Sequence, residues 1–164
     1  GGTMKMLQDA GLKVINISEV TGFPEICDGR VKTLHPKVFG GILGRRGLAE
    51  DEAQMKQYEI PEIDLVIVDL YPFEDTVASG ASEADIIEKI DIGGISLIRA
   101  GAKNFKDVVI IPSKAEYKPL LDIVKEQGAE TTLDQRRWFA TQAFGVSSHY
   151  DTAIHSYFDE TNKK

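Results

Sequence analysis

The chain has 164 residues and a mass of 18.1 kDa, which is enough for one domain but not comfortably for two. Its 19 Lys and Arg residues against 26 Asp and Glu residues give a net charge of −7, which argues against broad binding to nucleic acid or to an anionic membrane. Because Cys27 is the single cysteine, the chain has no internal disulfide, and no Cys or His spacing matches a zinc site. No apolar run is long enough for a membrane span. We therefore expect a soluble protein of the reducing cytoplasm without a metal.

The first half of the sequence predicts short helices that precede a buried strand. Thr3 can cap a first helix and Gly11 can end it, because Thr accepts free N–H groups at a helix start and Gly suits the left-handed position after the last turn. The run Leu65–Val68 has no polar alternation, which indicates a buried parallel strand. The expected elements are a helix at 4–10, a strand at 14–17, a loop at 18–29, a helix starting at Pro36, a surface helix at 50–58 and the strand at 65–68.

Three capping boxes mark helix starts in the second half: Ser82 with Asp85, Ser113 with Glu116, and Thr132 with Gln135. They predict helices at about 82–90 and 113–128 and a long helical region from 132, with a further helix at 95–102 and a second buried strand at 108–111. The alternation of aliphatic strands with helices is typical of an α/β domain with a parallel sheet flanked by helices.

Aromatic residues are concentrated after residue 130. Six apolar residues there follow helical spacing, with steps of 4, 3, 4, 4 and 3: Phe139, Ala143, Val146, Tyr150, Ile154 and Tyr157. We therefore divide the chain into an α/β domain over residues 1–130 and a helical extension over residues 131–164. This apolar stripe is equally consistent with packing in the core of one subunit and with packing against a partner chain.

Three loops leave or approach the carboxyl edge of the predicted sheet, where open α/β sheets bind their ligands. The loops 30–36, 69–73 and 91–94 would bring together Arg30, Lys32, Thr33, Tyr71 and Asp91, with Lys103 at the end of the following helix. Glycine-rich helix starts at 92–94 and 1–3 can offer free N–H groups to an anion. Taken singly, these residues are more often a helix cap, a solvated cation or a loop anchor, so spacing alone indicates no more than an anion pocket.

Six residue strings, in chain order, are more specific: VTGFPE at 20–25, DGRVKTLHP at 28–36, GGIL at 40–43, DLYPF at 69–73, IDIGG at 90–94 and AKN at 102–104. Together they resemble the IMP cyclohydrolase domain of the bifunctional purine enzyme AICAR transformylase/IMP cyclohydrolase, from Gly1 to about Asp159. The resemblance implies a methylglyoxal-synthase-like α/β fold. It also implies the last step of de novo purine synthesis, in which 5-formyl-AICAR ribonucleotide closes to IMP with loss of water.

The ring closure is an intramolecular attack of a carboxamide nitrogen on a formyl carbon, so the resemblance implies no metal or organic cofactor, and a purine nucleotide as substrate and product. By the same resemblance, Lys32 and Lys103 would stabilise the oxyanion, while Tyr71 and Asp91 would position the reacting groups and move protons. The resemblance further implies three groups of substrate contacts: holding residues Arg30 and Thr33, backbone donors Ile92, Gly93 and Gly94 near the base, and a phosphate-binding turn that includes Gly1, Gly2 and Thr3.

The resemblance also implies an intertwined homodimer and shows where this sequence departs from the family pattern. The pattern places a strand, a turn with Ser and Lys, and a helix before the Gly-Gly-Thr turn, so we expect this chain alone to be weakly active or unstable. Formyl transfer from a folate is expected of a transformylase domain outside this sequence. Phe39 stands where many relatives would have His, and Gly101 where they would have Ala, and we expect both to be tolerated.

Two other functions remain open. A nucleotide-binding regulatory domain of the same fold, like that of carbamoyl-phosphate synthetases, would bind a nucleotide without catalysis. Such a domain has no need of the set Lys32, Tyr71, Asp91 and Lys103, which is the feature that favours an enzyme. Methylglyoxal synthase itself would act on a triose phosphate with a carboxylate base and a His, and its motifs are not seen in this sequence.

Overall fold

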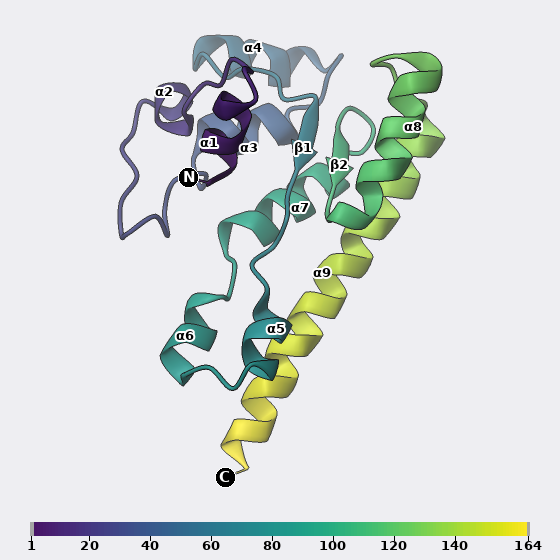
Figure 1. The fold of residues 1–164 in the computed structure, drawn as a ribbon. Helices are drawn as coiled ribbons and strands as arrows, with labels where there is room; N and C mark the ends of the chain where they lie inside the picture. The colour runs from purple at the N-terminus through teal and green to yellow at the C-terminus, as the bar shows by residue number, and fades with distance from the viewer. Residues whose placement is uncertain (1, 164) are drawn as a thin grey trace.

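A computed structural model describes residues 2–163, and a two-stranded parallel sheet lies at its centre. Strand β1 (Leu65–Ile67) pairs with β2 (Val109–Ile111), with Leu65 opposite Val109 and Ile67 opposite Ile111. Helices α7 (Gly93–Lys103) and α9 (Leu133–Asn162) pack on this sheet, and α9 runs past it along most of the molecule (Figure 1). The other elements are α1 (Gly2–Asp9), α2 (Ile17–Thr21), α3 (Pro36–Leu43), α4 (Ala49–Gln57), α5 (Phe73–Ala78), α6 (Glu83–Glu88), the 3₁₀ turn η1 (Lys114–Glu116) and α8 (Tyr117–Gln127). The expected α/β fold, with a small parallel sheet, flanking helices and a long C-terminal helix, is confirmed.

Capping residues start and end helices where the sequence predicted. The Ser82 hydroxyl accepts the Asp85 N–H at 3.2 Å at the start of α6. Thr132 and Gln135 form a complete capping box at the start of α9. Gly128 ends α8 with a φ of 80°, a backbone conformation that other residues rarely adopt. These ends are local, because each depends on side chains within a few residues of the helix terminus.

The strand expected at residues 14–17 is wrong, because this segment leads into α2 instead. Asn16 caps α2: its Oδ1 accepts the Ser18 N–H at 3.1 Å, and the Glu19 carboxylate accepts the Asn16 N–H at 3.1 Å. A strand needs a hydrogen-bonded neighbour, and Ile15 is 62% exposed with no described strand beside it. The local capping box therefore determines the conformation here.

Strand β1 is buried on one face only, which corrects the expectation of a wholly buried strand. Val66 is 7% exposed, whereas Leu65 and Ile67 are 44% and 49% exposed. The described sheet has two strands, and the second face of β1 is therefore only partly covered by residues 2–163. Val108, just before β2, belongs to the core, and the other core side chains come from β1, β2, α3, α7 and α9: Val38, Ile42, Val66, Ile98, Ala102, Ile110, Ile111, Phe139 and Ala143.

Helix α9 belongs to this core, which decides between the two roles that its apolar stripe allowed. Phe139 is fully buried and Tyr150 is 6% exposed, so the stripe packs within the subunit. Arg136 anchors the start of the helix, because its guanidinium donates to the carbonyls of Phe105 and Lys106 at 3.0 and 2.9 Å. Within residues 2–163, no helix is both long enough and apolar enough to cross a membrane.

Candidate active site

The loop that carries Thr33 lies against the start of α7. A Cβ atom built on Gly93 would come within 3.0 Å of the Thr33 hydroxyl oxygen, so the two segments are in contact. Arg30, from the same loop, pairs with Glu88 at the end of α6, with 2.6 Å between Nη2 and Oε2. This hydrogen bond lowers the pKa of Glu88 and raises the pKa of Arg30. Thr33 therefore lies beside the 91–94 segment, with Lys32 half-buried next to it, while Arg30 is held by a carboxylate of its own chain.

Asp91 folds its carboxylate over the first turn of α7. Its Oδ1 accepts the Gly94 N–H at 2.6 Å, and a negative charge is favourable at this end of a helix. A Cβ atom on Gly94 would lie 2.6 Å from the other carboxylate oxygen, so a glycine is needed for the carboxylate to sit there. Asp91 is therefore a helix cap in this structure, and the Gly94 N–H is used within the chain. Ile92 beside it is 58% exposed.

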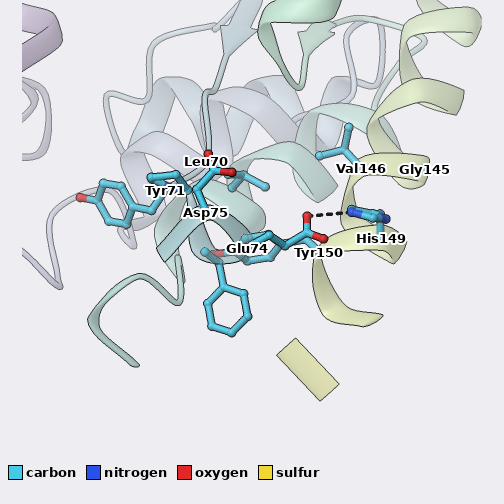
Figure 2. Close-up of a pocket in the computed structure, with 10 residues that line it drawn as sticks. Leu70, Tyr71, Glu74, Asp75, Gly145, Val146, His149 and Tyr150 are labelled. Atoms are coloured by element: carbon cyan, nitrogen blue, oxygen red, sulfur yellow. Dashed lines mark hydrogen bonds and ion pairs between the residues drawn. The ribbon is translucent and has the colours of Figure 1, made fainter. Parts of the chain in front are cut away.

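Tyr71 lies just after β1 and faces the side of α6. It is 51% exposed, and the Lys89 ammonium lies 5.6 Å from the centre of its ring, a cation–π contact. Figure 2 shows the Tyr71 ring pointing away from Glu74 and His149, on the opposite side of the loop. Since Lys89 is two residues before Asp91, the ring is directed toward the segment that carries that carboxylate.

A pocket of about 370 Å³ opens between the loop after β1 and helix α9 (Figure 2). Leu70, Val146 and Tyr150 contribute to its walls, and the Glu74 carboxylate lies 2.8 Å from His149 Nε2. Of the predicted site residues within 2–163, only Tyr71 lines it, and its ring is turned outward. The pocket is therefore a neighbour of the candidate site rather than its centre.

Lys103 lies at the opposite end of α7 from Asp91. From Gly93 to Lys103 the helix axis rises by roughly 15 Å, at about 1.5 Å per residue. Because α7 crosses over between two parallel strands, it runs antiparallel to them and ends at the amino edge of the sheet. Lys103 thus lies at the end of the helix that follows the 91–94 segment, as the sequence predicted, and within one chain this places it away from Asp91 and Thr33.

Lys103 lines a groove of about 470 Å³ between α3, α7 and α9. Arg99, one turn earlier on α7, also lines this groove, and its guanidinium lies 6.0 Å from the centre of the Phe144 ring. Phe39 of α3 contributes a second aromatic ring. Two cations beside aromatic rings are suited to an anionic, aromatic ligand.

The Gly-Gly-Thr turn is described only in part, because Gly1 lies outside the described residues. Helix α1 begins at Gly2, so Thr3 lies in its first turn and does not cap it, which corrects the expected start at residue 4. Both residues are exposed, and α1 has no buried residue. Within residues 2–163 no group of three His, Cys, Asp or Glu side chains could hold a metal ion.

The sequence-based prediction did not identify two residues at these sites, Tyr150 and Arg99. The Tyr150 hydroxyl accepts the Asp91 N–H at 2.8 Å, but a residue in an apolar stripe carries no signal for a polar partner 59 positions away. Arg99 did have a signal: Ser96, Arg99 and Lys103 follow each other at steps of 3 and 4, which places them on one face of the helix that precedes the AKN string.

Comparisons with known proteins identify two family relationships. Residues 1–96 match the MGS-like domain family, and residues 101–164 match the AICARFT/IMPCHase bienzyme family. The chain is 65% identical over 159 residues to the bifunctional purine biosynthesis protein PurH of Bacteroides thetaiotaomicron and 51% identical over 158 residues to PurH of Rhodospirillum rubrum. The matches take in 97% and 96% of this chain but 31% and 30% of the relatives, so the chain spans about a third of their length.

A solved structure agrees with this relationship. The chain is similar to the crystal structure of ForH, with a TM-score of 0.80 and 34% sequence identity, over 96% of this chain and 83% of that one. The resemblance predicted from the six residue strings is confirmed by these matches. The chain therefore belongs to the family of MGS-like domains, and its residues 101–164 match the AICARFT/IMPCHase bienzyme family.

Proposed function

We propose that this domain closes 5-formyl-AICAR ribonucleotide to IMP. One observation carries the proposal: the loop of Lys32 and Thr33 lies against the start of α7, where the Asp91 carboxylate is fixed by the Gly94 N–H. This juxtaposition brings the Thr33 hydroxyl and the Asp91 carboxylate to one glycine-lined helix start, and Lys32 is the residue next to Thr33 in the chain. The names of the relatives, which place them in purine biosynthesis, support the same reaction.

The chemistry assigns a role to each group. A bond forms between the carboxamide nitrogen and the formyl carbon, and the bond between that carbon and its oxygen then breaks as the carbon forms a double bond to the formamide nitrogen. The oxygen leaves as water with one proton from the carboxamide nitrogen and one from the formamide nitrogen. Lys32 stabilises the oxyanion formed by the attack, and the Asp91 carboxylate accepts a proton from the attacking nitrogen. Tyr71 positions the reacting groups, while Arg30, Thr33 and the N–H groups of Ile92 and Gly93 hold the substrate. Because nucleophile and electrophile belong to one molecule, holding one conformer supplies part of the rate.

Lys103 enters this proposal through a second copy of the chain. It lies roughly 15 Å along α7 from the Asp91 end, beyond direct contact with an oxyanion held there. Its groove is open, and Trp138 and Phe144 of α9 are 47% and 44% exposed, which leaves apolar surface for a partner. We propose a homodimer in which Lys103 of one protomer completes the site of the other.

Absorbance measurements of ring closure test the proposed reaction. Lys32→Ala and Lys103→Ala should each lower turnover at least about tenfold, or ~1.4 kcal/mol in the barrier, while both variants stay folded. Lys37→Ala and Lys106→Ala are charge-matched controls on neighbouring turns and should keep full turnover. Wild-type turnover in a Lys32 or Lys103 variant would remove that residue from the mechanism. Retained IMP binding by the wild-type chain without ring closure would favour a nucleotide-binding regulatory domain.

A hybrid dimer tests the placement of Lys103. Co-expression of Lys32→Ala and Lys103→Ala chains with different affinity tags gives heterodimers that can be purified. If each site takes Lys32 from one chain and Lys103 from the other, one site of the heterodimer has both lysines and the other site has neither. About half of the wild-type turnover per dimer should then return, although each parent is impaired. Heterodimers no more active than the two parents would place both lysines in the same chain.

A further inference from the structure

Tyr150 of α9 reaches across to the turn that precedes the Asp91 carboxylate. Its hydroxyl oxygen accepts the Asp91 N–H at 2.8 Å and donates to the Lys89 carbonyl at 2.8 Å. One hydroxyl thus binds the backbone on both sides of Ile90. Both of its hydrogen bonds go to the segment that links α6 to α7, so the conformation of this segment depends on the position of α9.

The ring of Tyr150 is itself held in place. It is 6% exposed and packs edge-on against Phe73, with 6.2 Å between ring centres and an interplanar angle of 70°. Burial raises the pKa of Tyr150, so the hydroxyl keeps the proton that it donates to Lys89. A buried ring with a fixed hydroxyl gives the segment before α7 a rigid attachment point.

The carboxylate of Asp91 is fixed from the other side by α7. The Gly94 N–H binds its Oδ1 at 2.6 Å, whereas Tyr150 binds the main chain of the same residue. The side chain and the backbone of Asp91 therefore have separate anchors on separate helices. Loss of the Tyr150 anchor would let the backbone rotate and would move the carboxylate even though its cap partner remains.

We infer that Tyr150 is a positioning residue for Asp91, and that α9 is thereby part of the active site. The inference rests on the proposed function, in which Asp91 takes a proton from the attacking nitrogen. It also gives a physical meaning to the two family matches. Residues 1–96, which include Asp91, match the MGS-like domain, whereas Tyr150 lies within the residues that match the bienzyme. The bienzyme portion supplies the group that orients a carboxylate in the MGS-like portion.

Tyr157 provides a matched control on the same helix. It packs edge-on against the same Phe73 ring at 5.9 Å, and its hydroxyl makes no hydrogen bond to the 89–94 segment among the described residues. Tyr157→Phe and Tyr150→Phe each remove one hydroxyl from the same aromatic cluster. A role in packing alone predicts similar effects of the two changes, whereas a positioning role predicts an effect of Tyr150→Phe only.

The experiment measures kcat and KM for ring closure in the full chain, well below the thermal midpoint of each variant. Tyr150→Phe should lower kcat about tenfold, or ~1.4 kcal/mol, with KM within about twofold of wild type, and should move the acidic limb of the kcat profile. Tyr157→Phe should leave kcat and this limb unchanged. In an Asp91→Asn background, Tyr150→Phe should cause little further loss, because the group that it positions is gone. Equal kcat values for the two Phe variants, or full additivity with Asp91→Asn, would overturn the inference.

A second variant keeps both the ring and the hydroxyl. Incorporation of 3-fluorotyrosine at position 150 lowers the pKa of the phenol, so the group loses its proton at a lower pH and can no longer donate to Lys89. The alkaline limb of the kcat profile should then move to lower pH, and an unmoved limb would also contradict the inference. Absence of ring closure in the wild-type chain would instead refute the proposed function, which separates the two failures.

Discussion

Asn104 ties the end of α7 to the end of α3, and its replacement tests whether this tie holds the Lys103 end of the helix. The side chain is 8% exposed, and its amide donates to the carbonyls of Ile42 and Gly44 at 2.8 and 3.2 Å. Both acceptors lie at the end of α3, about 60 positions away in the sequence. A carboxylate of the same shape can accept hydrogen bonds but cannot donate to either carbonyl.

The structure sets the expected magnitudes. Asn104→Ala leaves one buried and one partly buried carbonyl without this donor and should lower the free energy of unfolding by roughly 2–3 kcal/mol, since an unsatisfied buried polar group costs about 1–3 kcal/mol. Asn104→Asp should cost about 3–5 kcal/mol at pH 7, because it buries an unpaired charge against two carbonyl oxygens. Burial raises the pKa of the introduced carboxyl above its value in the unfolded chain. The Asp variant should therefore regain stability as the pH falls below that raised pKa, because the protonated carboxyl can donate one hydrogen bond.

Urea unfolding followed by circular dichroism measures both variants, at pH 7 and again near pH 4. Asn162→Ala is a suitable control, since Asn162 is exposed at the end of α9 and should change stability by less than about 0.5 kcal/mol. The reasoning would be refuted by equal losses for the Ala and Asp variants at pH 7. It would also be refuted by an Asp variant whose stability relative to wild type does not improve on acidification.

Two further predictions concern Asp91 and a surface ion pair. Gly94→Ala would place a Cβ atom 2.6 Å from the Asp91 carboxylate and displace this cap, so it should cost about 1 kcal/mol of stability and lower the rate of ring closure, whereas the control Gly145→Ala, with open space around it, should stabilise the fold by roughly 0.5–1 kcal/mol. Thermal unfolding and the ring-closure assay measure both effects, and an active, stable Gly94→Ala variant would contradict the role of Asp91 as a cap. A side-chain hydrogen bond from Arg45 lowers the pKa of Asp51 to about 2, so this pair stabilises the fold above the unfolded pKa of Asp and loses its effect as the pH falls from about 4 through 2. The Asp51→Asn variant should therefore lose less free energy of unfolding than the wild type over that pH window, and equal losses in the two proteins would contradict this role of the pair.

The candidate site was predictable from the sequence where its residues are contiguous. The string Ile90–Gly94 predicted both an Asp cap and a functional carboxylate, and the structure shows the cap. The string that contains Thr33 predicted a loop near this helix start, and Thr33 lies against Gly93. Tyr150 could not be predicted, because its polar contact depends on how far along the sheet α9 is placed and not on any residue near Tyr150.

The same limit explains the errors in the strands. Residues 14–17 have the β-branched composition of a strand, but composition does not supply the neighbouring strand that a ladder of hydrogen bonds requires. Likewise, the apolar run at 65–68 predicts a strand buried on both faces, whereas in the described chain Val66 is buried and Leu65 and Ile67 on the other face are 44% and 49% exposed. In both cases the missing information is the identity of the packing partner.

By itself, the sequence determined the capped helix ends at Ser82, Gly128 and Thr132, the parallel α/β class and the family, because caps, apolar periodicity and contiguous strings are encoded within a few residues of one another. Only the tertiary structure decided which groups meet. It placed the Lys103 end of α7 at the amino edge of the sheet, since a crossover helix must run antiparallel to the strands that it joins. It also turned the stripe of α9 into the core of the subunit and aimed the Tyr150 hydroxyl at Asp91, because the depth and register of helix packing are set by side chains far apart in the chain.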